Sequence, residues 1–314
     1  MGTYIDQLNS FTLASLPDLD TVVMGALELF QSSPVPDINT NLFKHPLVVG
    51  SGNAEATGRI IFRDSDAVFA SESDFAAKLQ AIPSIDGVVL ISASGAKHAP
   101  IIAAKAREMG KQVALITNTE HNETAAKFSQ DSNFQQFVYP KNREPYTYNT
   151  STYMGMILGS TGEDPAAIAT FLQETIAGLG FPDFSQYQKY YLIVPPQFAG
   201  IIRMLNVKFI ELFGRNIARD IETSEYVRHA TTVAPSKELF ISFGEENTTW
   251  GKPEDRLYVP LPERAGYGAM MAVGYYTIAQ IQKQYAPFFK DNIEAYTAEI
   301  SRVFGSTITP IVEK

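Results

Sequence analysis

Two short segments, each rich in serine and glycine, follow apolar runs in this sequence. They are GSGN, which holds Ser51, and SASGAK, which holds Ser92, Ser94 and Lys97. A loop that leaves a strand and opens a helix presents free backbone N–H groups and the positive end of the helix dipole. Together with serine hydroxyls and a lysine, these donors bind anions, phosphate above all. We therefore predict a phosphate site at these two loops.

Each serine taken alone has a simpler role, because serine commonly caps helices and contributes about 1 kcal/mol there. Two such loops in one sheet favour the phosphate site. A dinucleotide fingerprint G-x-G-x-x-G is not formed, since Glu55 occupies the third glycine position and would set a carboxylate against the pyrophosphate. The pattern G-x-x-x-x-G-K-[ST] is absent as well, so nothing in the sequence supports nucleotide hydrolysis.

The composition narrows the chemistry further. The 314 residues include no cysteine, which excludes disulfides, thiolate chemistry and cysteine-containing zinc sites. The four histidines, at positions 45, 98, 121 and 229, show no metal-ligand spacing. We therefore expect no metal and no organic cofactor, and chemistry that comes from carboxylates, hydroxyls, amines and a single histidine.

Charge and hydropathy indicate which partners to expect. Hydrophobic residues make up 45% of the chain, enough for a sizeable core, and the net charge of −9 comes without a block of like charges. A nucleic-acid partner is therefore not expected. No apolar run reaches 18 residues, and the first residues, MGTYIDQLNSF, lack a basic region followed by an apolar stretch. We expect no membrane partner, no signal peptide and a cytoplasmic location.

Apolar strands and helices alternate through the first half of the chain. Residues 18–32 carry apolar side chains at helical spacing, which predicts a helix. Short runs of Val, Ile and Leu then alternate with longer helical patterns, as is typical of a parallel sheet covered on both faces. We expect a serine cap on the helix after AVF, and one edge strand with an irregular connection over 128–150. The strands predicted before that connection are LVV, AVF, GVVLI and QVALIT.

The second half repeats this order weakly. LVVGSGNAEATGRIIF in the first half corresponds to LIVPPQFAGIIRMLNVKFI in the second, and each is a strand, a turn and a helix. Pro195 and Pro196 replace the Gly-Ser turn and remove two N–H donors, so we expect the first half to hold the anion. Strands KELFISFG and RLYVPLP and two long final helices complete the predicted elements.

Four segments in order resemble the sugar isomerase (SIS) domain proteins: VVGSGNAEATG; LISASGAKHAP followed by KQVALIT; NTSTYMGMI; and KFIELFG with ETSEYVRH. The arrangement is similar to the double-SIS isomerase half of glutamine–fructose-6-phosphate aminotransferase and to the fructosamine-phosphate deglycases. The resemblance covers about residues 40 to 300. It implies an α/β fold with two SIS subdomains. Each subdomain would be a flavodoxin-like, three-layer αβα sandwich in which helices flank a mainly parallel sheet. The implied division is a helical segment over 1–40, a first, phosphate-binding SIS domain over 41–180, and a second over 181–314.

The resemblance also implies roles for the serine loops. The phosphate of a sugar phosphate would be held by Ser92 and Ser94, with help from Ser51. Lys97 stands where the family carries a threonine, a change that keeps an affinity for anions and alters the geometry. Contacts to the sugar itself are implied for Gly52, Asn53 and Ser151.

The implied catalytic residues lie in the second half. Interconversion of an aldose and a ketose through an enediol needs one base that moves a proton between C2 and C1, and groups that open the ring. The match to the family's base is Glu211, and the match to its ring-opening histidine is His229, with Glu225 four residues before it. Either Glu222 or Glu225 could instead orient the histidine ring.

Spacing constrains this pair. If one helix ran from Glu211 to His229, the two residues would lie roughly 27 Å apart at about 1.5 Å per residue and could not share a substrate. Either the chain folds back after Gly214, or His229 serves the site of a neighbouring subunit, as the family's histidine does. The second alternative makes the active unit a homodimer or a higher homo-oligomer.

The resulting hypothesis is a phosphosugar isomerase of carbohydrate-derivative metabolism that acts on a ketose or aldose 6-phosphate through an enediol. A fructosamine-6-phosphate deglycase uses the same logic with an amine leaving group and stays an alternative. A non-catalytic sugar-phosphate sensor is a third interpretation, weakened because no DNA-binding segment precedes the first SIS domain. The glutamine-hydrolysing domain and its cysteine nucleophile are lacking, so amide transfer is not implied. The tail STITPIVEK is expected to close over the site, with Lys314 near it.

Overall fold

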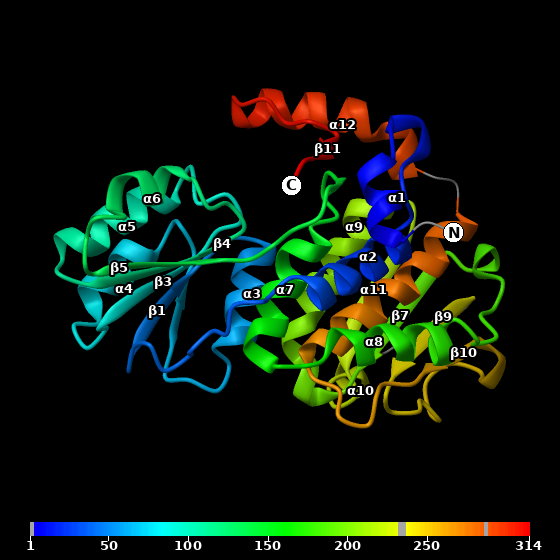
Figure 1. Cartoon of the computed structure of the whole chain (residues 1–314). Coiled ribbons are helices and arrows are strands. Elements are labelled where there is room, and N and C mark those ends of the chain that lie inside the picture. Colours follow the sequence, from blue (N-terminus) through cyan, green and yellow to red (C-terminus); the bar gives the residue numbers. More distant parts are fainter. Residues whose placement is uncertain (1–2, 232–236, 286–287) are drawn as a thin grey trace. The chain divides into compact units, whose positions relative to one another are not determined.

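The structure, a computed structural model, describes residues 3–231, 237–285 and 288–314 (Figure 1). The chain forms two compact units. The four-stranded unit comprises Met1–Ser32, Asn142–Ser151 and Glu163–Lys314, and the five-stranded unit comprises Ser33–Lys141 and Thr152–Gly162. These units differ from the linear boundaries expected at residues 40 and 180, because the first helices and the 142–151 segment pack with the C-terminal half.

The five-stranded unit contains a parallel sheet with the strand order β2-β1-β3-β4-β5. This is the flavodoxin-like order, and it confirms the expected α/β architecture. The edge strand expected within 128–150 is β5. The strands are β1 (Pro46–Val49), β2 (Val68–Ala70), β3 (Gly87–Ile91), β4 (Gln112–Thr117) and β5 (Phe134–Val138). The helices are α3 (Asn53–Ile61), α4 (Phe75–Ala81), α5 (Ala99–Glu108), α6 (Glu123–Phe128) and α7 (Thr150–Thr161), the last of which begins in the other unit.

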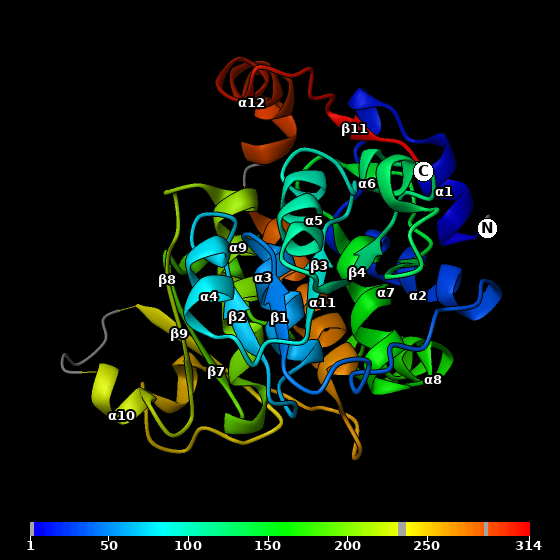
Figure 2. The ribbon, with the colours of Figure 1, turned by 90° about the vertical axis from the view of Figure 1, so that its left-hand side faces the viewer.

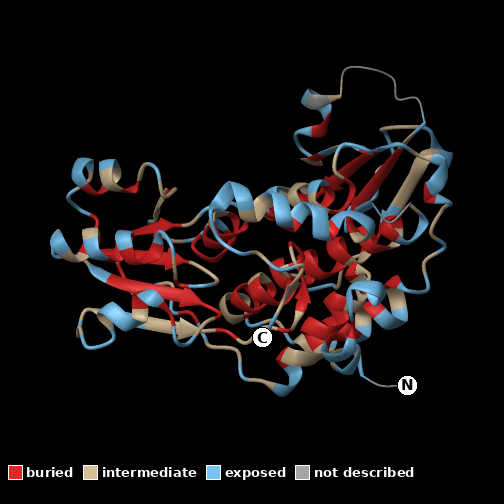
Figure 3. Cartoon of the chain, turned by 90° about the horizontal axis from the view of Figure 1, so that it is seen from above, coloured by how far each residue is buried: buried red, intermediate tan, exposed pale blue. Residues whose placement is uncertain are grey.

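Alternate residues of these strands face opposite layers. Leu47, Val88 and Leu115 pack with α4 and α5, whereas Val48 and Val89 pack with α3 and α7. Since both faces are covered, the strands consist of continuous apolar runs. Figure 3 shows buried residues, in red, concentrated in the strands and on the inner sides of the helices.

Two local expectations need correction in this unit. The N-cap of α4 is Asp74 and not a serine, and one oxygen of its carboxylate accepts the N–H of Ser71 at 2.7 Å. Helix α6 was not predicted because it has only six residues and lies in a polar stretch. A signal for it is present, since Asn122 precedes it and its side chain accepts the N–H of Ala125 at 2.9 Å.

The four-stranded unit holds the parallel sheet β10-β9-β7-β8, in which β7, β8 and β9 lie side by side (Figure 2). Strand β8 was not predicted, because ARDIET is an edge strand with a mostly polar sequence. The strands are β7 (Lys189–Val194), β8 (Ala218–Thr223), β9 (Glu238–Phe243) and β10 (Arg256–Val259). The helices are α1 (Tyr4–Ser10), α2 (Leu19–Ser32), α8 (Pro165–Phe171), α9 (Ile202–Phe213), α10 (Val227–Ala230), α11 (Tyr267–Gln284) and α12 (Phe288–Phe304). Short helical turns are η1 (Leu13–Ser15), η2 (Leu172–Ile176), η3 (Phe184–Gln186), η4 (Pro196–Ile201) and η5 (Pro253–Asp255).

Helix α11 is the centre of this unit, with most of its residues buried, and it packs against α2 and α9. Its first turn is capped from a distance by Glu163, whose carboxylate accepts the N–H groups of Gly266, Gly268 and Ala269 at 2.7–3.0 Å. The approach to α9 requires a glycine at position 274, since a Cβ there would lie 2.7 Å from a methyl group of Leu205.

The C-terminal residues return to the 142–151 segment. Strand β11 (Ile311–Val312) pairs antiparallel with β6 (Glu144–Pro145). Beside this pair, the Arg143 guanidinium lies 3.0 Å from the Glu313 carboxylate, and the N–H of Tyr146 donates to the carbonyl of Pro310 at 2.8 Å. The tail is thus fixed by backbone pairing within the four-stranded unit. Among the described helices, none combines the length and the apolar character that crossing a membrane demands.

Candidate active site

The serine loops lie where the five-stranded sheet changes its direction of winding. Strands β1 and β3 are neighbours, yet the helices that follow them, α3 and α5, pack on opposite faces. In open α/β sheets ligands bind at this switch point, outside the carboxyl ends of the strands. Val49 of β1 is paired with Leu90 of β3. Ser51 and Ser92 each follow these paired residues by two positions, so both serines lie at the same edge of the sheet.

The second serine loop is anchored from the β4–α6 side. The carbonyl of Ala93 accepts the N–H of Asn118 and the hydroxyls of Thr117 and Thr119 at 3.0–3.2 Å. The carbonyl of Gly95 accepts the hydroxyl of Thr124 at 2.7 Å. Two carbonyl oxygens of the loop are therefore occupied by protein groups and do not oppose an anion.

A glycine is needed at position 95. Its φ is +59°, and a Cβ there would lie 2.5 Å from the Asn122 side chain. Neither serine of the loop caps α5, whose N-cap is His98 without a side-chain cap bond. Instead, the Ser92 hydroxyl accepts the N–H of Gly95 at 3.2 Å and the Ser94 hydroxyl accepts that of Ala96 at 3.4 Å. The simple helix-capping role is thus not the one that the structure shows.

A histidine and a glutamate from two neighbouring loops lie close together in this unit. His98 Nε2 lies 3.1 Å from an oxygen of Glu72, which follows β2. Because β2 and β3 flank β1, this pair joins the loops on either side of the turn that carries Ser51. Lys97 is exposed and has a left-handed backbone, with φ of +58°. Gly52 has the same φ, and Asn53 begins α3 with a buried side chain.

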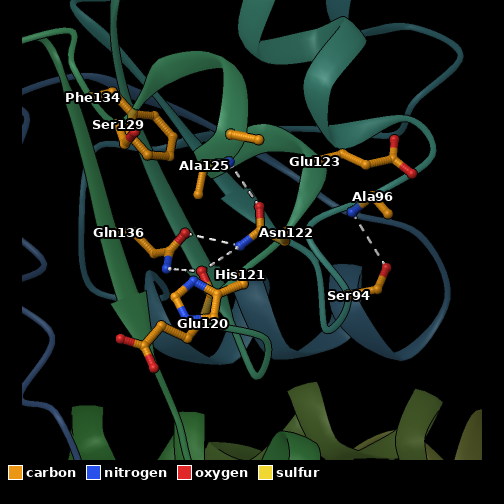
Figure 4. A pocket seen from close by; sticks show the side chains of 11 residues that line it. Ser94, Ala96, Glu120, His121, Asn122, Glu123, Ala125, Ser129, Phe134 and Gln136 are labelled. Carbon is orange, nitrogen blue, oxygen red and sulfur yellow. Dashed lines mark hydrogen bonds between the residues drawn. The ribbon is translucent and has the colours of Figure 1, made fainter.

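A pocket of about 860 Å³ opens beside Ser94, over α6 and β5 (Figure 4). At its centre the amide of Asn122 donates to Gln136 at 2.9 Å. Glu120 and Glu123 stand among its lining residues, and their carboxylates disfavour an anion. The pocket and the predicted phosphate loop therefore differ in charge although they share Ser94.

In the four-stranded unit, Glu211 lies near the end of α9 and is paired with a lysine that sequence reasoning missed. Lys208 is fully buried, and its Nζ donates to an oxygen of Glu211 at 2.9 Å. The same nitrogen donates to the carbonyls of Thr147 at 2.8 Å and Tyr148 at 2.6 Å. The spacing of three in KFIE is the sequence signal that could have found Lys208.

This pair sets the acidity of Glu211. Burial raises the pKa of its carboxyl above the ordinary value, and the charge of Lys208 acts in the opposite direction. The Glu211 side chain is still 18% exposed, so it can meet a ligand. A partly accessible carboxyl with a raised pKa suits proton transfer near neutral pH.

Ser151, predicted to contact the sugar, is fully buried at the start of α7. Its hydroxyl accepts the N–H of Asn142 at 2.9 Å and donates to Glu144. Glu144 also accepts the N–H groups of Thr150 and Ser151 at 2.7 and 2.8 Å. Burial raises the pKa of Glu144, while these hydrogen bonds and Lys208 oppose that rise. The Ser151 hydroxyl is thus engaged by protein groups.

Glu211 and His229 do not come together in one chain. The chain does fold back after Gly214, but it does so as β8, which starts beside the end of α9 and leads to α10 with His229 at its far end (Figure 2). The six residues of β8 span roughly 20 Å. His229 and Glu225 are exposed there, so their predicted role would have to be played in a neighbouring subunit's site. Within the described ranges, no group of three or more His, Asp or Glu residues is placed to hold a metal ion.

No family model and no curated protein matches this chain. Solved structures do. A protein provisionally described as a phosphosugar isomerase, from Clostridium difficile, is similar at 10% identity and a TM-score of 0.56, over 95% of this chain and 99% of that one. Tagatose-6-phosphate ketose/aldose isomerase from Escherichia coli is similar at 14% identity and 0.55, over 91% and 95%. The C-terminal domain of glucosamine-fructose-6-phosphate aminotransferase from Francisella tularensis is similar at 11% and 0.51, over 90% and 95%. At these identities the likenesses show a shared fold.

Proposed function

We propose that this chain is a sugar-phosphate isomerase that interconverts an aldose and a ketose through an enediol. The observation that carries the proposal is the buried Lys208–Glu211 pair, which holds a partly accessible carboxyl with a raised pKa. The fold shared with phosphosugar isomerases supports it, and so does the phosphate-binding role that the sequence predicts for the serine loops. The phosphate-binding role of Ser51, Ser92, Ser94 and Lys97 stays a prediction from the sequence.

In this proposal Glu211 acts as the base. Its carboxylate takes the proton from C2 of the open-chain aldose. The electron pair of that C–H bond forms the C1–C2 double bond, the π pair of the C1 carbonyl moves onto O1, and O1 takes up a proton from solvent, which gives the enediol. The C2 hydroxyl then loses its proton to solvent and becomes the ketone carbonyl, while the electron pair of the C1–C2 double bond takes the proton from the carboxylic acid at C1. This gives the ketose and restores the carboxylate. The charge of Lys208 favours the carboxylate form of Glu211, because it lowers the pKa that burial raises.

Turnover by the Glu211→Gln variant tests the proposal. With D-tagatose 6-phosphate and D-fructose 6-phosphate as substrates, we expect kcat to fall by about 10²- to 10⁴-fold, the usual contribution of a positioned acid or base. Affinity measured by calorimetry should stay within about threefold, since the amide has the shape of the carboxyl. Glu294→Gln on the exposed side of α12 is the matched control and should retain full activity.

Two results would overturn the proposal. One is unchanged turnover in Glu211→Gln. The other is a parent protein that binds neither sugar phosphate. A parent that binds these sugars but turns over only a fructosamine 6-phosphate would reassign the same base to deglycation.

A further inference from the structure

Two tyrosines from separate segments meet near Glu211. Tyr146 follows β6 directly, and Tyr296 lies on α12, which packs against α9. Their ring centroids are 6.2 Å apart, with the ring planes inclined by 39°. This separation is within the range of interacting aromatic pairs. The rings therefore form one continuous aromatic surface made of residues 150 positions apart in the sequence.

Both rings lie within electrostatic reach of Glu211. Burial is the main cause of the raised pKa of each phenol. The negative charge of Glu211 raises both pKa values further. The two residues after Tyr146, Thr147 and Tyr148, supply the carbonyls that hold Lys208. The segment that carries Tyr146 is thus the one that positions the ion pair of Glu211.

Packing alone does not explain Tyr296. Helix α12 is held by a stripe of buried residues, Phe289, Ile293 and Thr297, at helical spacing. Tyr296 lies beside this stripe and remains 41% exposed. A large ring left partly open beside a buried acid is free to contact a ligand, and aromatic side chains commonly line ligand sites.

We propose that Tyr146 and Tyr296 form the wall of the Glu211 site on which the reacting end of the sugar phosphate packs. The inference rests on the proposed function, because it takes Glu211 as the base. The wall contacts the apolar C–H face of carbons C1 to C3 and keeps water from the side of the carboxyl that it covers. It is a specificity element, since the orientation of the C3 hydroxyl decides how closely that face approaches the rings.

Alanine and phenylalanine variants of each tyrosine test the wall. With D-tagatose 6-phosphate, Tyr146→Ala and Tyr296→Ala should each raise KM about tenfold, whereas kcat stays within about threefold. The corresponding Phe variants keep the ring and should remain within twofold of the parent in KM. Tyr258→Ala is the matched control, because Tyr258 on β10 has the same 41% exposure and lies outside the wall.

Binding separates the failure of the wall from the failure of the function. Calorimetry with D-tagatose 6-phosphate in the Glu211→Gln background should show the same tenfold loss for the Ala variants, independent of turnover. If the parent is an active isomerase and both Ala variants keep the parental KM, only the wall is refuted. Phe variants whose KM is raised as much as that of the Ala variants would also refute the wall, because the hydroxyl and not the ring would then contact the substrate. If Tyr146→Ala fails to fold, Tyr296, outside the packing stripe, decides the question.

Discussion

Replacing Lys208 by methionine isolates the interaction on which the proposed base depends. At an effective dielectric constant of about 20, unit charges separated by the 2.9 Å between Lys208 Nζ and the Glu211 oxygen attract by about 6 kcal/mol. The 18% exposure of Glu211 screens part of this attraction, so we expect a coupling of about 3 kcal/mol. Lys208→Met also leaves the carbonyls of Thr147 and Tyr148 without their donor, which adds to the cost of the single variant.

A double-mutant cycle separates these contributions. Lys208→Met, Glu211→Gln and the double variant are compared with the parent by urea denaturation. The readout is the fluorescence of Trp250, the single tryptophan of the chain. It packs against Tyr191, Ile193 and Phe240 of the four-stranded unit, so it reports on the unit that holds the pair. The loss of unfolding free energy in the double variant should be smaller than the sum of the losses in the two single variants. The difference is the coupling energy, and it arises because the double variant leaves no uncompensated charge.

The coupling also has a predicted pH dependence. Burial raises the pKa of Glu211, so the folded protein binds this proton more tightly than the unfolded chain does. The stability contributed by the protonated carboxyl is present at low pH and is lost as the pH rises through the folded-state pKa. Lys208 reduces that loss. The penalty of Lys208→Met should therefore shrink when the pH is lowered from 8 to 5, and the acid limb of its kcat profile should move to higher pH. A coupling below about 0.5 kcal/mol, or a penalty that grows on acidification, would refute this account.

Two further predictions concern Glu144 and subunit exchange. Glu144→Gln should lower the free energy of unfolding in urea by about 2–4 kcal/mol, because the buried carboxylate accepts three hydrogen bonds from Thr150 and Ser151. The control, Glu313→Gln at an exposed position, should lower it by less than about 1 kcal/mol. Equal losses in the two variants would contradict the structural role of Glu144. Glu211 and His229 lie at opposite ends of β8. If His229 acts in a neighbouring subunit, mixing inactive Glu211→Gln subunits with inactive His229→Asn subunits should restore measurable turnover. A mixture that stays inactive after subunit exchange would rule that role out.

The sheets could be predicted from the sequence for a clear physical reason. Strand β3 is buried over all five residues, and a short strand that is buried on both faces must be a continuous apolar run, a pattern that loops and half-exposed strands do not show. Strand β8 escaped prediction because an edge strand alternates or is polar. Helix α6 escaped because six residues show less than two turns of periodicity.

The residues around the candidate base were harder to predict. Glu211 came from a resemblance, but Lys208 did not, although the two are three residues apart. An exposed Lys–Glu pair at this spacing is common on helix surfaces. Lys208 differs from such a pair because it is buried and donates hydrogen bonds to two backbone carbonyls about 60 positions earlier in the chain. Glu144 depends in the same way on the start of α7. Such roles arise from tertiary contacts that local patterns do not encode.

The backbone at Lys97 limits how this loop can be converted into that of a relative. With φ at +58°, the position suits glycine, asparagine or an unbranched side chain, whereas a β-branched residue there is a conformational outlier. The threonine that the SIS resemblance places at this position therefore cannot be introduced by one substitution without bending the turn. A grafting experiment on this serine loop should accordingly exchange residues 92–98 as a block.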